Sequence, residues 1–157
     1  MIKGSFYFLS EEYCEKFSKY GVMDNKEITL GEVRKRPCFY SIQDIKNKDI
    51  FWMIPISSKI DKYQTILNQK LKRYKTYDGL EFGYVQGRKA AFLLQNICPI
   101  TEKYVVEQYI DEKTGKEVSI PNDLKRKLES KARKIMNKYY QGTKIVITDL
   151  DYIFNNL

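Results

Sequence analysis

Two adjacent serines and a lysine, Ser57-Ser58-Lys59, directly follow an apolar run at residues 50–56 that is typical of a strand. An amphipathic pattern begins at once, so we expect a helix that starts at Ser57 or Ser58. The free N–H groups of a helix start, two hydroxyls and an ammonium group together favour the binding of an anion. Helix capping alone also explains a serine at this position, and capping is the commoner role.

The chain of 157 residues contains no histidine, which restricts the chemistry that these serines could support. Zinc sites with imidazole ligands, Ser-His-Asp and Cys-His nucleophile systems, and ribonucleases with paired imidazoles are excluded. RNA carries its own nucleophile, the 2′-hydroxyl, so its cleavage requires only positioning, charge stabilisation and proton transfer. Because Ser, Lys and Tyr side chains could supply these, we expect neither a metal nor a cofactor.

A basic cluster, Arg34-Lys35-Arg36, precedes a second strand-like segment at residues 37–45. Residues 46–49 have the composition of a turn, so 37–45 and 50–56 should pair as an antiparallel hairpin. That pairing would bring Arg36 or Lys35 close to the serine pair, where a cation could stabilise a phosphate.

The positive charge is concentrated in two stretches. The whole chain is +8, with 28 Lys and Arg against 20 Asp and Glu; residues 59–75 hold six cations and one carboxylate, and residues 123–138 hold seven cations and two carboxylates. Two basic helices on a nearly neutral body are typical of proteins that bind a phosphate backbone, although a solvated lysine face gives the same pattern. Tyrosine rings among the cations suit unstacked RNA bases. The residues that we expect to contact RNA are Arg34, Lys35, Lys62, Tyr63, Lys70, Lys72, Arg73, Lys75, Lys125, Arg126, Lys131, Arg133 and Lys134.

The remaining patterns predict one α+β domain over residues 1–157, a small antiparallel sheet with flanking helices. Besides the hairpin above, strands are expected at 3–9, 80–85, 89–96 and 143–147, with a tight turn at Gln86-Gly87-Arg88. Helices are expected after Ser10, after the serine pair, from Pro121 to Gly142, and after a capping segment at Thr148–Asp151.

Two of these helices should present an apolar face to the sheet. In the helix after the serines, the face consists of Ile60, Tyr63, Ile66, Leu67, Leu71 and Tyr74. In the helix after Pro121, it consists of Leu124, Leu128, Ala132, Ile135 and Tyr139.

Three well-separated cysteines, with no CxxC spacing, indicate reduced thiols and a cytoplasmic protein. Cys38 lies in a predicted strand, so burial explains it better than a nucleophilic role. Asp149 and Asp151 are better explained by helix capping than by metal binding. No segment has the length and apolar character of a signal peptide or a membrane span.

The stretch Phe51–Lys59 resembles the core motif of type III toxin–antitoxin endoribonucleases, the ToxN/AbiQ family, and in particular its CptN-like branch. Similar segments lie at Phe6-Tyr7, Arg34–Pro37, 82–85, 91–96 and 99–101, so the resemblance covers most of the chain.

This resemblance implies a small twisted antiparallel sheet or barrel, similar to the Kid/MazF toxins, with flanking helices. It implies sequence-specific, metal-independent RNA cleavage that leaves a 2′,3′-cyclic phosphate and a 5′-hydroxyl. It also implies a small repeat-derived RNA antitoxin, a pseudoknot, which the toxin processes and which inhibits it in a closed protein–RNA oligomer.

Within the motif, the resemblance places Ser57 and Ser58 at the cleavage site, with Lys59 as a catalytic cation. The family's other basic residue follows a proline on the preceding strand; here Cys38 follows Pro37, so we expect Arg36 to take that role as the second catalytic cation. Lys62 instead of Lys59, and Lys35 instead of Arg36, remain alternatives for the contact with the scissile phosphate. We expect a cytoplasmic bacterial toxin involved in phage defence, with cellular or phage RNA as substrate. A non-catalytic basic RNA-binding module is the alternative function, and neither reading involves a membrane.

Overall fold

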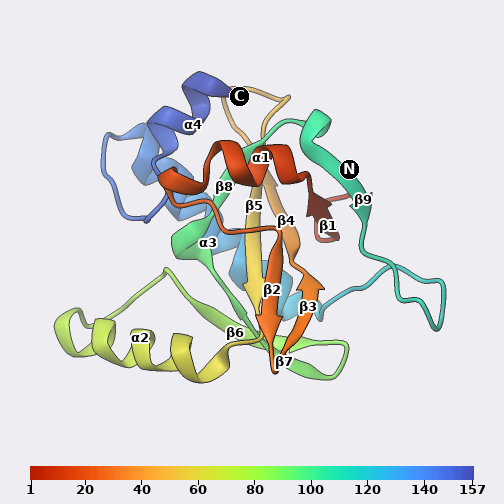
Figure 1. The fold of residues 1–157 in the computed structure, drawn as a ribbon. Coiled ribbons are helices and arrows are strands. Elements are labelled where there is room, and N and C mark those ends of the chain that lie inside the picture. Colours follow the sequence, from red (N-terminus) through yellow and green to blue (C-terminus); the bar gives the residue numbers. More distant parts are fainter.

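The computed structural model describes residues 1–157, which are arranged around an antiparallel sheet with flanking helices (Figure 1). The expected α+β class is confirmed, and the sheet is open rather than closed into a barrel. Along the sheet the order is β6 (Glu81–Val85), β7 (Arg88–Phe92), β5 (Phe51–Ser57), β4 (Pro37–Gln43), β1 (Phe6–Leu9) and β9 (Val105–Gln108), while β8 (Cys98–Ile100) also pairs with β5.

Strand β5 lies at the centre of the sheet because its apolar run is buried on both faces. The expected hairpin with β4 is confirmed, with Cys38 opposite Pro55 and Gln43 opposite Phe51. The buried Asp44 stabilises the turn between the two strands by accepting hydrogen bonds from the Lys46 backbone N–H at 2.8 Å and the indole N–H of Trp52 at 2.8 Å. These bonds fix where β5 begins and therefore where its far end, at Ser57, must lie.

The hairpin of β6 and β7 is also confirmed, since Val85 pairs with Arg88 across the turn. Gln86 and Gly87 form the turn, and both have positive φ values, 51° and 76°, as the right-handed twist of a two-residue hairpin requires. β7 continues the sheet by pairing with the last two residues of β5, Ile56 and Ser57.

Four α-helices surround the sheet: α1 (Glu11–Lys16), α2 (Ile60–Arg73), α3 (Asn122–Tyr140) and α4 (Leu150–Asn156). The apolar face of α3 packs on the sheet, with Leu128 and Ile135 in the same buried cluster as Trp52 and Phe92. Its expected face is confirmed, including the half-buried Tyr139, which packs against the same cluster. At the end of α3 the Tyr140 hydroxyl lies 2.9 Å from both oxygens of Asp44 and joins the helix to the β4–β5 turn.

Helix α2 buries much less than its sequence pattern predicts. Of the expected apolar face only Tyr63 is buried, while Leu71 and Tyr74 are 43% and 48% exposed. Ile60, Ile66 and Leu67 are only partly buried, against the small cluster that contains Tyr63. Figure 1 shows that α2 extends away from the sheet.

Three segments differ from the strands that the sequence predicts. Residues 143–147 form no strand and are mostly exposed, and the expected strand at 89–96 ends at Phe92 before a 3-10 turn at Leu94–Asn96. The sequence patterns also missed a separate two-stranded sheet, β2 (Lys26–Thr29) with β3 (Glu32–Lys35), joined by Leu30 and Gly31. None of the helices is long and apolar enough to cross a membrane.

Candidate functional site

The serine pair lies at the end of β5, before α2 begins at Ile60. Ser57 is the last residue of the strand and is 3% exposed, whereas Ser58 and Lys59 face solvent. Lys59 occupies the N-cap position and no side chain caps the helix. The expected start of the helix at Ser57 or Ser58 is therefore wrong, and the hydroxyls are available for other partners.

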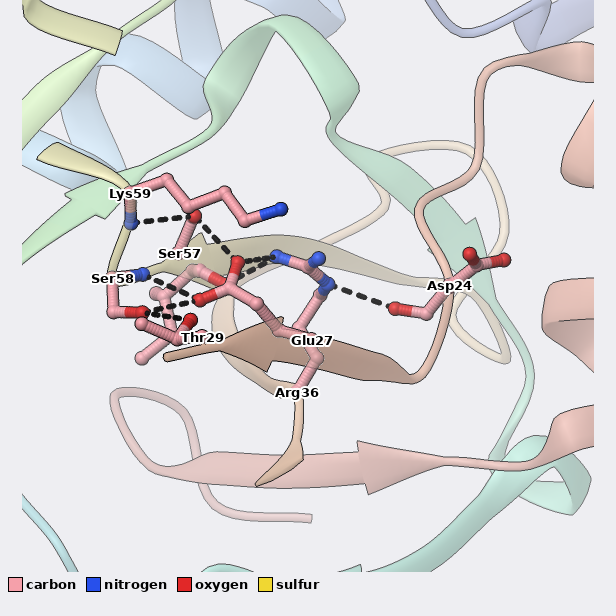
Figure 2. Close-up of polar contacts among 8 residues, drawn as sticks. Asp24, Glu27, Thr29, Arg36, Ser57, Ser58 and Lys59 are labelled. Atoms are coloured by element: carbon pink, nitrogen blue, oxygen red, sulfur yellow. Dashed lines mark hydrogen bonds and ion pairs between the residues drawn. The ribbon is translucent and has the colours of Figure 1, made fainter. Parts of the chain in front are cut away.

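Both serines bind the carboxylate of Glu27, which extends from strand β2 (Figure 2). One carboxylate oxygen accepts bonds from the Ser58 hydroxyl at 2.5 Å and the Ser58 backbone N–H at 2.8 Å. The other accepts from the Ser57 hydroxyl at 2.6 Å and from Arg36 Nη1 at 3.0 Å. Thr29, on the same strand as Glu27, lies 3.0 Å from the Ser58 hydroxyl. Four donors thus converge on a single anion.

Arg36 contributes a buried charge to this cluster, since the residue is only 7% exposed. Besides Glu27, its guanidinium donates to the carbonyl of Ile56 at 2.8 Å and to the carbonyl of Asp24 at 2.8 Å. Through these bonds Arg36 joins the segment just before β2 to the last residues of β5. A guanidinium so held keeps one fixed orientation toward the serine pair.

Lys35, the alternative to Arg36, lies elsewhere. Its ammonium group pairs with Glu107 at 2.8 Å and lies 5.5 Å from the centre of the Phe8 ring. Arg34 is also engaged away from the serines, in an ion pair with Glu32 at 2.7 Å. Of the three consecutive basic residues Arg34, Lys35 and Arg36, only Arg36 contacts the residues of the serine pair's site.

The surroundings of Glu27 keep its carboxylate ionised. Burial by itself raises the pKa of Glu27, but hydrogen bonds from Ser57 and Ser58 and the charge of Arg36 outweigh it, so that the pKa lies below its ordinary value. Burial raises the pKa of Tyr63, which faces the same cluster from α2 and remains a neutral phenol. The site therefore holds one negative and one positive charge at neutral pH.

Two lysines border the cluster without closing it. The Lys59 side chain extends beside Ser57, whose hydroxyl oxygen accepts the Lys59 backbone N–H at 3.1 Å, and its ammonium group has no hydrogen-bond or ion-pair partner (Figure 2). The Lys62 ammonium lies 5.3 Å from the centre of the Tyr63 ring. Lys59 thus extends beside the serine pair, whereas the contact of Lys62 is with Tyr63.

The other residues expected to bind RNA fall into two groups. On and after α2, none of Lys62, Lys70, Lys72, Arg73 and Lys75 forms an ion pair, although Lys70 and Arg73 lie 5.5 and 5.3 Å from the Tyr77 and Tyr74 rings. On α3, Lys125 and Arg126 have no ionic partner, whereas Lys131 pairs with Glu81 at 2.8 Å, Arg133 with Glu129 at 3.1 Å and Lys134 with Asp78 at 2.5 Å.

The structure also bears on two smaller expectations. Cys38 is buried, and burial raises the pKa of its thiol well above the ordinary value, which leaves it unsuited to act as a nucleophile. Asp149 caps α4 by accepting the Tyr152 backbone N–H at 3.1 Å, as the sequence predicts.

Sequence reasoning missed Glu27 and Thr29. A hairpin signal was present, because residues 26–29 and 32–35 flank Leu30-Gly31, a turn with positive φ at both positions. Nothing local to Glu27 indicates its partner, since it contacts a serine 30 residues later in the chain.

No family model and no curated protein matches the sequence. Among solved structures, the chain is similar to AbiQ, a lactococcal anti-phage endoribonuclease of the type III toxin–antitoxin system, at 16% identity and a TM-score of 0.64, covering 96% of this chain and 93% of AbiQ. It is also similar to a structure from a bacterial antiviral system regulated by a processed non-coding RNA, at 14% identity and a TM-score of 0.66, covering 97% of this chain and 96% of the other. At these identities the likeness establishes a shared fold over nearly the whole chain, the fold that the ToxN/AbiQ resemblance implies.

Proposed function

We propose that the protein is a sequence-specific, metal-independent endoribonuclease toxin of a type III toxin–antitoxin system. The observation that carries the proposal is the convergence of Ser57, Ser58 and Arg36 on one anion. A set of donors that holds a carboxylate in this way also suits the non-bridging oxygens of a phosphodiester. The fold shared with AbiQ, an endoribonuclease, supports the same reaction.

In this mechanism the 2′-hydroxyl of the substrate attacks the adjacent phosphorus, and the bond to the 5′-oxygen breaks. The products are a 2′,3′-cyclic phosphate and a 5′-hydroxyl. Ser57 and Ser58 hold the non-bridging phosphoryl oxygens, so that the 2′-oxygen attacks in line with the bond to the 5′-oxygen. Arg36 from the buried side and Lys59 from the solvent side balance the charge of the phosphorane.

The proposed inhibitor is a small repeat-derived RNA that folds as a pseudoknot, is processed by the toxin, and forms a closed oligomer with it in the bacterial cytoplasm. The cations on and after α2 support this proposal, because they are free of protein carboxylates and begin beside the serine pair. A structure from an antiviral system regulated by a processed non-coding RNA, which shares the fold, supports an RNA partner.

Cleavage by the purified protein, freed of bound RNA, tests the function. We expect RNA to be cut in excess EDTA and the upstream fragments to end in cyclic phosphate; loss of all cutting in EDTA would contradict the metal-free mechanism. Ser58→Ala should remove cleavage and toxicity, while Ser130→Ala, at an exposed serine of α3, should retain both. RNA binding without any product from the wild type would instead identify a non-catalytic RNA-binding module.

A further inference from the structure

Glu27 is the only carboxylate that contacts the serine pair, and the proposed mechanism so far gives it no part. RNA cleavage by the 2′-hydroxyl requires a group that removes the hydroxyl proton as the bond to phosphorus forms. We propose that Glu27 is this proton acceptor and hence a catalytic residue. The inference rests on the proposed endoribonuclease function.

The composition of the site leaves few alternatives. The chain has no histidine, the usual general base in ribonucleases that cut in this way. Arg36 and Lys59 are cations that donate hydrogen bonds, and Thr29 offers only a hydroxyl. Tyr63 keeps its proton because burial raises its pKa. Glu27 is the one side chain of the cluster that is ionised at neutral pH and can accept a proton.

A carboxylate that receives four hydrogen bonds is a weak base, so the bound substrate must change its surroundings. The hydroxyls of Ser57 and Ser58 that now bind Glu27 are the donors that the phosphoryl oxygens would take. When the phosphate binds them, Glu27 loses these donors and gains a negative charge nearby, and both changes raise its pKa. The substrate itself thereby turns Glu27 into an effective base.

The charged and titratable groups that face Glu27 are few. Arg36 lies against one carboxylate oxygen, and Arg34 is the residue opposite on the neighbouring strand β3. Tyr63 approaches from α2, and Lys59 extends beside Ser57 without bonding to Glu27. Arg34 is held by Glu32, and Tyr63 remains neutral. Arg36 is therefore the main group that opposes the rise in the pKa of Glu27, and sharing it with the phosphate weakens that opposition.

The step balances without any further reactant. The 2′-oxygen gives its proton to a Glu27 oxygen and forms a bond to phosphorus, while the bond between phosphorus and the 5′-oxygen breaks. The departing 5′-oxygen takes a proton from the Lys59 ammonium or from water. Glu27 then releases its proton to solvent, to which its side chain, 10% exposed, still has access.

Glu27→Gln tests this role, because the amide keeps the shape of the side chain but cannot accept the proton. In single-turnover cleavage of an RNA that the wild type cuts, we expect the rate to fall about 10²- to 10⁴-fold. RNA affinity should remain within a few-fold of the wild type. The wild-type rate should fall as the pH drops through the pKa of Glu27 in the complex, and the residual rate of Glu27→Gln should lack this fall.

The matched control is Glu12→Gln, which removes an exposed carboxylate of α1 that has no side-chain hydrogen-bond or ion-pair partner and should leave cleavage unchanged. If Glu27→Gln cuts within threefold of the wild type, or faster, the carboxylate only occupies the phosphate position and the inference is wrong. If Glu27→Gln fails to fold because Arg36 has lost its partner, Glu27→Ala with added formate decides, since a small carboxylate can replace both the charge and the base. Recovery of cleavage with formate, at a rate that rises with its concentration, supports the role, whereas no recovery at any formate concentration rejects it.

The outcome is separable from failure of the proposed function. If the wild type and Glu12→Gln do not cut RNA, the endoribonuclease function itself has failed. If both cut RNA and Glu27→Gln cuts equally well, only the role of Glu27 has failed.

Discussion

Helices α2 and α3 arise from stretches with the same net charge of +5, yet the rest of the molecule holds them in opposite ways. Helix α3 buries five residues, whereas α2 buries only Tyr63. Three α3 cations, Lys131, Arg133 and Lys134, are paired with carboxylates, whereas no cation of α2 is. Figure 1 shows α3 against the sheet and α2 extending from it.

The difference teaches that net charge and apolar periodicity do not by themselves identify a surface that binds a polyanion. Two of the carboxylates that pair with α3, Glu81 and Asp78, belong to β6 and the segment before it, so part of the charge of α3 serves to hold the helix in place. On α2 the same charge is available to a ligand, and the helix begins one residue after Lys59. The two helices should therefore respond differently to the same kind of substitution.

The largest difference should appear in stability. Leu128→Ala removes a fully buried side chain from the α3 face and should lower the free energy of unfolding by about 2–5 kcal/mol. Leu71→Ala, at the exposed end of α2, should change it by less than about 0.5 kcal/mol. Urea titrations followed by circular dichroism measure both values. Equal losses would show that α2 packs as firmly as α3 in solution.

For RNA binding, substitutions on α2 should have a larger effect than substitutions on α3. Replacing Lys70, Lys72 and Arg73 of α2 by Gln should reduce the slope of log K against log salt by about 2, since each neutralised phosphate of a single strand contributes about 0.7. The measurement is a salt titration of RNA affinity with Ser58→Ala, which avoids cleavage.

The matched control for that experiment is the variant in which Lys131, Arg133 and Lys134, whose charges are already paired, are all replaced by Gln. It should reduce the slope by less than the α2 triple does. If the α3 triple has the larger effect, RNA follows α3, and its ion pairs open when RNA binds.

The smallest expected effect concerns one ion pair. Lys131 and Glu81 are each about a quarter exposed, at 24% and 21%, so Lys131→Gln should cost about 1 kcal/mol of stability, partly because Glu81 loses its partner. Lys72→Gln, at an exposed and unpaired lysine of α2, should leave stability unchanged. Thermal unfolding at low and high salt measures both, and the loss at Lys131 should shrink as salt screens the pair.

Much of the fold was predictable because it depends on local patterns. The β4–β5 and β6–β7 hairpins and the core-facing stripe of α3 follow from alternation, turn composition and helical spacing. The strand expected at residues 143–147 was wrong, since Ile145 and Ile147 are exposed. Isolated hydrogen bonds, such as that from the Ile147 N–H to the Gln95 carbonyl at 2.7 Å, hold the segment instead of a strand ladder.

Only part of the candidate site was predictable from the sequence. Ser57, Ser58 and Arg36 could be placed together because a predicted hairpin joins their strands. Glu27 could not, because it is one of 20 acidic residues and lies on a short polar hairpin whose contact with the serines is purely tertiary. The helix start was misplaced for the same reason, as the hydroxyls expected to cap α2 bind Glu27 instead.

The pairing of β1 with β9 has a consequence for the order in which the protein is made. Tyr7 lies opposite Gln108, so β1 must wait for β9, which is synthesised much later, to complete its edge of the sheet. Every residue assigned to the serine cluster is translated by Tyr63, but Ala91, the β7 neighbour of Ser57, and helix α3 follow much later. Such long-range pairing forms slowly, and a nascent chain can complete this site only once β7 and α3 have been synthesised.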